Sequence, residues 1–214
     1  MNTRVLIVTV GLACATAWPG PARAADARLA GRLDPATAAD VDRIVTEARE
    51  RRLPADPLIS KAIEGAAKGA RSDRILAAVR AEAAALDSAR AWLGAASSDA
   101  ELMAGAGALL AGAPPESLAR LRALRERQSL VVPLVVLADL VARRVPAAAA
   151  SGAVLVATRA GAGDVDLLRL RQRIERDIEG GASPATTAIL RARTLDLRGG
   201  PDKRAGAGAG GTPP

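Results

Sequence analysis

Apolar residues recur along this chain at spacings of three and four, which is the period of a helix with one buried face. One such stripe runs from Leu76 through Val79, Ala83 and Leu86 to Leu93. Ala, Leu, Arg and Glu, which favour helix, dominate the sequence, and no segment sustains the alternation of a half-buried strand. The pattern therefore predicts an all-α protein.

Capping residues and prolines divide residues 34–197 into eight or nine helices. A cap followed by Pro marks three helix starts, and Ser98 with Glu101 forms a capping box. The expected caps are Asp34, Asp56, Ser72, Ser98, Asp164 and Ser183. Apolar positions assigned to inward faces include Leu102, Ala106, Leu109 and Leu110, then Leu118, Leu121 and Leu124, and finally Ile189 and Leu190. The segment from Leu130 to Arg144 is apolar nearly all round.

Four tight turns join pairs of these helices. They contain Gly69, Gly112, Arg144 and Gly181, which lie 43, 32 and 37 residues apart. Helical-hairpin repeats have periods of about 34 to 47 residues. We therefore expect successive helical hairpins that stack into a solenoid-like array, with an irregular bundle as the alternative.

The two ends of the chain differ from its centre. Residues 1–24 have a basic start, an apolar stretch and the small-residue site Ala22-Arg23-Ala24, which is the order of a signal peptide. Cleavage after Ala24 would export the protein to the periplasm or the medium. A lipoprotein signal at Cys14 is the alternative, although Gly11 stands where such signals favour Leu. Residues 25–197 form the expected single helical domain, and residues 198–214 an expected disordered, Gly- and Pro-rich tail.

Composition excludes several classes of chemistry. The chain has no His, and its single Cys lies in the signal segment, so ordinary zinc, haem and copper sites are not expected. A Ser-His-Asp or Cys-His pair is excluded for the same reason. After cleavage Trp92 is the only aromatic residue, which argues against nucleic-acid binding by base stacking. The mature chain would carry 28 basic and 23 acidic residues, a net charge of +5. We expect no cofactor and no metal.

Three features are candidates for interaction. Asp139 and Arg143 lie four residues apart in the most apolar segment and can form a partly buried ion pair, for which a structural salt bridge is the simpler reading. Trp92 would anchor an interface if it is exposed. Arginines cluster twice, at residues 120, 122, 125 and 127 and at Arg169, Arg171, Arg173 and Arg176. Interleaved acids, including Asp177 four residues after Arg173, favour a solvated mixed face.

Two weaker candidates have simple structural explanations. The pairs Asp40 with Asp42 and Asp164 with Asp166 resemble halves of a cation site, but residues two apart on a helix face different ways. Lys68 and Ser72 resemble a Ser-Lys nucleophile pair, but Glu64 is expected to pair with Lys68.

These observations predict a non-enzymatic scaffold or protein-interaction module of the cell envelope, with an unknown protein partner. The alternative is a binder of anionic surfaces, either lipid headgroups or acidic polymers, through its arginine-rich helix faces. Membrane association would require that alternative or a lipid on Cys14. A carboxylate or Ser/Lys hydrolase is a third class, and it would need a deep pocket lined by acids or by Lys68.

Overall fold

The computed structural model describes residues 26–198, and these residues form nine helices and no strand. The prediction of an all-α fold with eight or nine helices is confirmed. The expected signal peptide and the expected tail lie outside the described residues. The helices are α1 (Pro35–Glu50), α2 (Asp56–Ala67), α3 (Ser72–Leu93), α4 (Asp99–Ala111), α5 (Pro115–Leu124), α6 (Val131–Ala142), α7 (Ala147–Arg159), α8 (Asp164–Glu179) and α9 (Pro184–Arg198).

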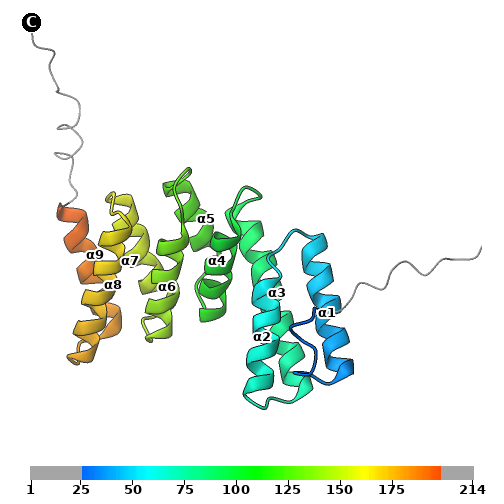
Figure 1. Ribbon diagram of the computed structural model, residues 1–214. Helices are drawn as coiled ribbons and strands as arrows, with labels where there is room; N and C mark the ends of the chain where they lie inside the picture. Colours follow the sequence, from blue (N-terminus) through cyan, green and yellow to red (C-terminus); the bar gives the residue numbers. More distant parts are fainter. Residues whose placement is uncertain (1–25, 199–214) are drawn as a thin grey trace, which may run out of the picture.

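From α3 onward, each helix packs against the helix two places along the chain. The pairs α4–α6 and α6–α8 build one layer, and the pairs α3–α5, α5–α7 and α7–α9 build the other. Figure 1 shows these helices side by side as an elongated array, with α1 and α2 against the first half of α3. In the text below, the layer of α4, α6 and α8 is called the even layer.

The four turns that the sequence marks share one backbone geometry. Gly69, Gly112, Arg144 and Gly181 all have positive φ, at 65°, 102°, 64° and 90°. In each turn the N–H of the next residue donates to the carbonyl oxygen five residues earlier, as in Val145 to Leu140 at 3.0 Å. This is the Schellman ending, which stops a helix and reverses the chain within a few residues. Whether the four hairpins are true sequence repeats stays a prediction.

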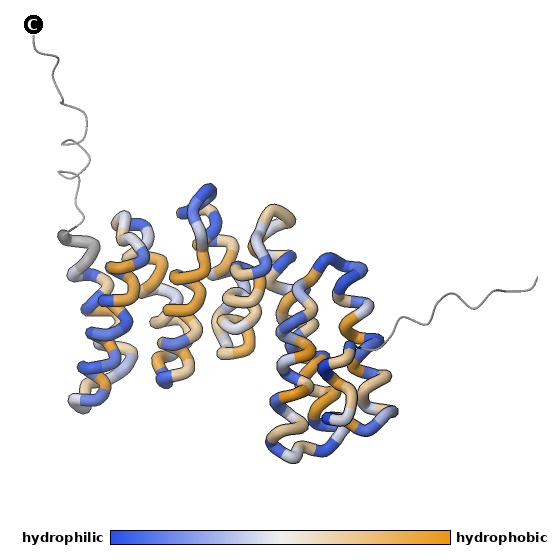
Figure 2. The backbone as a smooth tube through the Cα atoms, viewed as in Figure 1, coloured by the Kyte–Doolittle hydropathy of each residue, from blue (hydrophilic) through white to orange (hydrophobic). Residues whose placement is uncertain are grey.

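Small side chains let the helices of the core approach closely. Figure 2 shows apolar segments on the helix sides that face one another. At Gly105 of α4, a methyl group would lie 3.0 Å from Leu93 and 3.1 Å from Ala89, both on α3. The largest fully buried side chains here are mostly leucines, such as Leu102 and Leu134. The core therefore consists of aliphatic side chains over close helix contacts.

Two of the predicted helix caps are confirmed. The carboxylate of Asp34 accepts from the backbone N–H of Thr37 at 3.0 Å and from its hydroxyl at 2.6 Å. Ser98 and Glu101 form the reciprocal capping box. Both caps join residues three apart, so local sequence specifies them.

Three other predicted caps are wrong, because the residue is the first of its helix and its side chain has a partner from elsewhere in the fold. Ser72 Oγ donates to Asp34 at 3.0 Å. Asp56 accepts from Arg28 at 2.9 Å, and Asp164 accepts from Arg125 at 2.6 Å. The residues in the cap positions are Ala55, Arg71 and Gly163.

Four apolar residues that the pattern assigned to inward faces are exposed instead. They are Leu110, Leu124, Ile189 and Leu190, with exposed fractions between 37% and 56%. The predicted helical spacing is correct, because other apolar residues on the same helices, such as Leu118 and Ala188, are fully buried. These helices carry apolar residues on more than one side. The residues on a side that no other helix covers are exposed.

Candidate functional site

Asp139 and Arg143 lie at the contact of α6 with α8, and each has its partner on α8. Arg171 donates to Asp139, and Arg143 lies 2.7 Å from Glu175. Arg171 and Glu175 are 3.5 Å apart, so the four side chains form a connected ladder. The predicted ion pair between Asp139 and Arg143 does not form. Arg171 and Glu175, which are four residues apart on α8, lie opposite Asp139 and Arg143 and bind them instead.

Arg169, Arg173 and Arg176 follow one another on α8 at spacings of four and three, so they lie on one face of that helix. We call them the α8 arginine stripe. Arg169 and Arg176 are exposed, and Arg173 is half-buried. The nearest carboxylate oxygen to Arg169 is that of Asp166, at 3.6 Å.

The acid expected to neutralise Arg173 is bound elsewhere. Asp177 accepts two hydrogen bonds from Arg191 of α9, at 2.7 and 2.8 Å. The Arg191 guanidinium also holds the pKa of Asp177 below its usual value. Glu175 is likewise engaged by Arg143 and Arg171. Tertiary contacts therefore leave the stripe more positive than the spacing of charges along α8 predicts.

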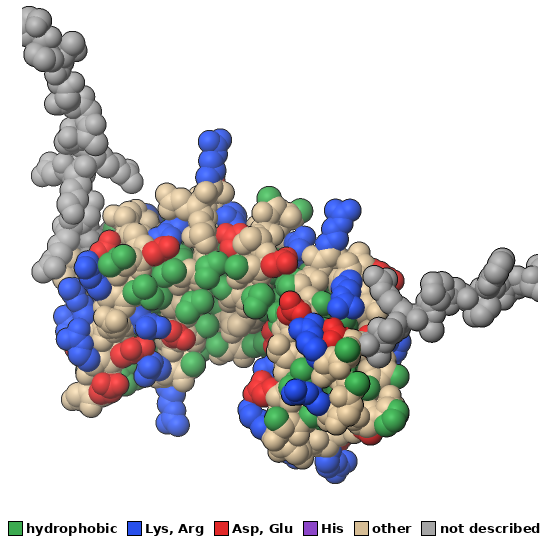
Figure 3. All heavy atoms as spheres, in the orientation of Figure 1, with side chains coloured by type: hydrophobic (Ala, Val, Ile, Leu, Met, Phe, Trp, Pro, Cys, Tyr) green, Lys and Arg blue, Asp and Glu red, His purple; other side chains and the backbone are tan. Residues whose placement is uncertain are grey.

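The outer surface of α4 and α6 is apolar. It bears no charged residue across eight exposed or half-buried positions, which we call the α4–α6 face: Ala100, Met103, Gly107, Leu110, Val131, Val135, Ala138 and Ala142. Figure 3 shows hydrophobic side chains gathered over the middle of the array on this side. Helices at a protein surface normally turn charged or polar residues outward. The uncharged face on these two adjacent helices is therefore the candidate interaction surface.

Trp92 is 41% exposed and is the last residue but one of α3. Of the residues singled out from the sequence, the structure brings Asp139 and Arg143 together with α8, where Arg169, Arg173 and Arg176 also lie. Trp92 belongs to the other layer. Its role as an interface anchor stays a prediction.

A buried polar cluster joins four segments that are distant in sequence. Glu101 accepts from Arg122 at 2.7 Å and from the N–H of Leu130 at 3.0 Å. Burial alone would raise the pKa of Glu101, but the hydrogen bonds from Arg122, Ser98 and Leu130 hold it below its usual value.

Beside it, the nearly buried Arg125 donates at 2.6 Å to both Asp164 and the carbonyl oxygen of Ala162. It also lines a hollow of about 370 Å³ with Gln128 and Ser129. Sequence reasoning recognised Glu101 only as part of a capping box and Arg125 only as part of a cluster, since their partners are 21 and 39 residues away. The guanidinium groups of Arg122 and Arg125 already have acceptors within the protein. We therefore interpret the cluster as structural: it holds the loops at residues 128–130 and 162–164 in place.

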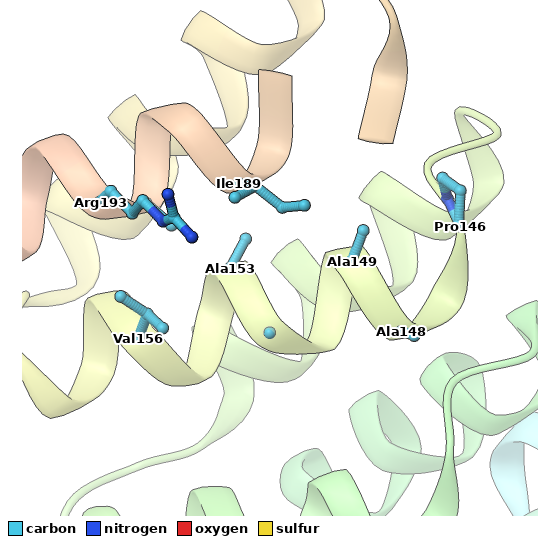
Figure 4. A pocket seen from close by; sticks show the side chains of 9 residues that line it. Pro146, Ala148, Ala149, Ala153, Val156, Ile189 and Arg193 are labelled. Carbon is cyan, nitrogen blue, oxygen red and sulfur yellow. The ribbon is translucent and has the colours of Figure 1, made fainter. Parts of the chain in front are cut away.

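An open apolar groove of about 510 Å³ runs between α7 and α9. Its floor is formed by small residues of α7, including Ala149, Gly152 and Ala153, and Ile189 and Arg193 of α9 stand over it (Figure 4). The lining contains one charged group, Arg193, and no acid. It is thus a shallow hydrophobic surface and lacks the convergent acids or lysine that the hydrolase hypothesis requires.

The residues of the two weaker hypotheses have other partners. Lys68 donates to Glu64 as expected, whereas Ser72 donates to Asp34. Asp40 binds Arg43 at 2.7 Å, and Asp42 accepts from the N–H of Asp26 at 3.4 Å. Within residues 26–198 no group of three or more acids is placed to hold a metal ion. None of the helices described is both long and apolar enough to span a bilayer.

Comparison with known proteins gives no relative for this arrangement. No family model matches the sequence, and no curated protein and no solved structure matches the chain. The site is therefore interpreted from its own chemistry.

Proposed function

We propose that this protein is a non-enzymatic scaffold or interaction module of the cell envelope, and that it binds another protein through the even layer. The observation that carries this proposal is the α4–α6 face, where Met103, Leu110 and Val135 are 46%, 50% and 39% exposed without a charged residue among them. Burial of apolar area is the main favourable term in protein association, at about 25 cal/mol per Å².

The proposal is tested by cross-linking in intact cells. A photoreactive amino acid replaces Val135, on the α4–α6 face, or Leu190, an even more exposed apolar residue of α9 in the other layer. The expected result is a discrete cross-linked product at Val135 and not at Leu190. Equal cross-linking at both positions, or none at Val135, would contradict the proposal. Fractionation of the same cells tests the expected location in the envelope.

The second candidate function is binding to anionic surfaces. It is favoured by the engagement of Asp177 with Arg191, which leaves the α8 arginine stripe more positive. Sedimentation with anionic lipid vesicles at low and high salt tests this function, because exposed charge interactions weaken as salt screens them. Failure to bind at low salt would eliminate it.

A further inference from the structure

The groove between α7 and α9, called the α7–α9 groove below, has the size of a small-molecule site. Its volume of about 510 Å³ lies within the range of about 300–1,000 Å³ that ligand pockets occupy. On the α7 side the space is open, because a methyl group added at Gly152 would meet nothing within 4 Å. At Gly105 of α4, by contrast, side chains of α3 and α5 already fill the space beside the glycine. The α7–α9 groove therefore has room for an occupant.

The lining of the groove is apolar along its length and carries its one charge on α9. Arg193 is that charge, and no acid lines the groove. In Figure 4, Arg193 extends from α9 over Ala153 and Val156, whereas Ile189 extends away from it in the direction of Pro146. The groove thus has a cationic end near Val156 and an apolar end near Pro146.

The length of the groove matches a single aliphatic chain. Val156 follows Pro146 by ten residues, which correspond to about 15 Å along a helix. A saturated chain advances by roughly 1.3 Å for each C–C bond of about 1.5 Å, so about 12 carbons span this distance. An amphiphile with one such chain and an acidic head would place its head at Arg193, because a guanidinium binds a carboxylate through charge-assisted hydrogen bonds.

The lining disfavours two other kinds of occupant. An extended peptide would bring its N–H and C=O groups against apolar side chains, which costs free energy unless those groups find partners. The walls offer few, because the backbone groups within α7 and α9 are bonded inside each helix. A partner helix is about 10–12 Å wide, slightly more than the 8–10 Å that separates packed helices, so it would lie across the groove without entering it.

We propose that the α7–α9 groove binds a free fatty acid of about 12 carbons, with its carboxylate at Arg193 and its chain directed toward Pro146. The inference goes beyond the proposed function, because this site lies in the other layer and does not involve the α4–α6 face. The groove is open on one side, so the bound chain would stay partly exposed to water.

Isothermal titration calorimetry of the full chain with octanoate, decanoate, dodecanoate and tetradecanoate, each below its micelle concentration, tests the size of the site. The affinity should rise about two- to fourfold for each added CH₂ up to dodecanoate, as apolar burial predicts, and should gain nothing further with tetradecanoate. Dodecanoate should bind at least about tenfold more tightly than dodecylammonium, which has the same chain and the opposite charge. Added salt should reduce this preference.

Two variants locate the site, and each has a matched control. Gly152→Leu fills the groove and should abolish binding of dodecanoate, whereas Gly107→Leu changes a glycine of α4 that also has open space around it and should have no effect. Arg193→Gln removes the charge and should eliminate the preference for dodecanoate over dodecylammonium. Arg120→Gln removes the same charge from an exposed position of α5 and should preserve it. Circular dichroism checks that each variant remains helical.

Several outcomes would overturn the inference. Equal affinities for dodecanoate and dodecylammonium would show that Arg193 does not select an acid. A continued rise in affinity at tetradecanoate would indicate partition onto an unspecific apolar surface. Binding of dodecanoate that survives in Gly152→Leu would place it elsewhere on the molecule. Concentration-dependent self-association that is lost in Gly152→Leu would identify a second copy of the chain as the occupant.

Discussion

Asp139 of α6 accepts a hydrogen bond from Arg171 of α8, which lies 32 residues further along the chain. Arg143, one turn after Asp139, has its own partner in Glu175. These two pairs join α6 to the side of α8 that carries Arg171 and Glu175.

The crossed pairing predicts which residues are energetically coupled. In double-mutant cycles with alanine, Asp139 and Arg171 should show a coupling of about 0.5 kcal/mol, as expected for a partly exposed pair. Asp139 and Arg143 should show a smaller value, since they have separate partners. Urea denaturation supplies the free energies of unfolding. A larger coupling for Asp139 with Arg143 would contradict the geometry.

Glu101 should contribute strongly to stability. Glu101→Ala leaves Arg122 and the buried N–H of Leu130 without their acceptor, so the free energy of unfolding should fall by about 3 kcal/mol. Glu101→Gln can still accept one hydrogen bond and should lose less. Chemical denaturation of both variants checks the order. Asp73→Ala, an exposed acid paired with Arg71 at 3.2 Å, is the control and should change stability by less than about 1 kcal/mol.

Two glycines of α4 should respond in opposite directions to the same substitution. At Gly105 a new methyl group would lie 3.0 Å from Leu93 and 3.1 Å from Ala89, so Gly105→Ala should destabilise by about 1 kcal/mol or more. At Gly107 the space is open, so Gly107→Ala should stabilise by about 0.5–1 kcal/mol through helix propensity. Thermal unfolding of the pair measures both changes. A gain at Gly105 would mean that α3 and α4 are less tightly packed than described.

Acid should weaken the contact that Asp34 makes between the start of α1 and the start of α3. The Thr37 hydroxyl and backbone N–H, with Ser72, lower the pKa of Asp34 from 3.8 to about 2. A lowered folded-state pKa gives stability that is complete above pH 3.8 and is lost as pH falls through about 2. Asp34→Asn keeps a capping side chain but cannot ionise, so its free energy of unfolding should fall less steeply over this range.

Denaturant titrations at several pH values test the prediction for Asp34. Asp87→Asn serves as the control, because Asp87 is an exposed acid in the middle of α3 that caps no helix. An acid dependence of Asp34→Asn as steep as that of the unaltered chain would argue against the contact.

The sequence by itself determined the helices, the four sharp turns and the caps at Asp34 and Ser98. Each depends on residues at most five apart: an apolar period, a reversal at a residue such as Gly112, or a side chain that reaches a backbone N–H three positions ahead. Such interactions are specified by residues that are close together along the chain. The candidate residues Asp139 and Arg143 were also identifiable, because charges in an apolar helix are conspicuous.

Only the tertiary structure decided the partners of those charges and the faces left uncovered. Asp177 follows Arg173 by four residues on α8, and the sequence pattern pairs the two. In the structure, Arg191 of α9 binds Asp177 instead. Leu110 and Leu102 are both leucines of α4, and one is half exposed whereas the other is fully buried. The difference arises from which helix lies beside each residue. The partners are 14 residues apart for Asp177 and Arg191 and 32 residues apart for Asp139 and Arg171, which is beyond the reach of a local helix pattern.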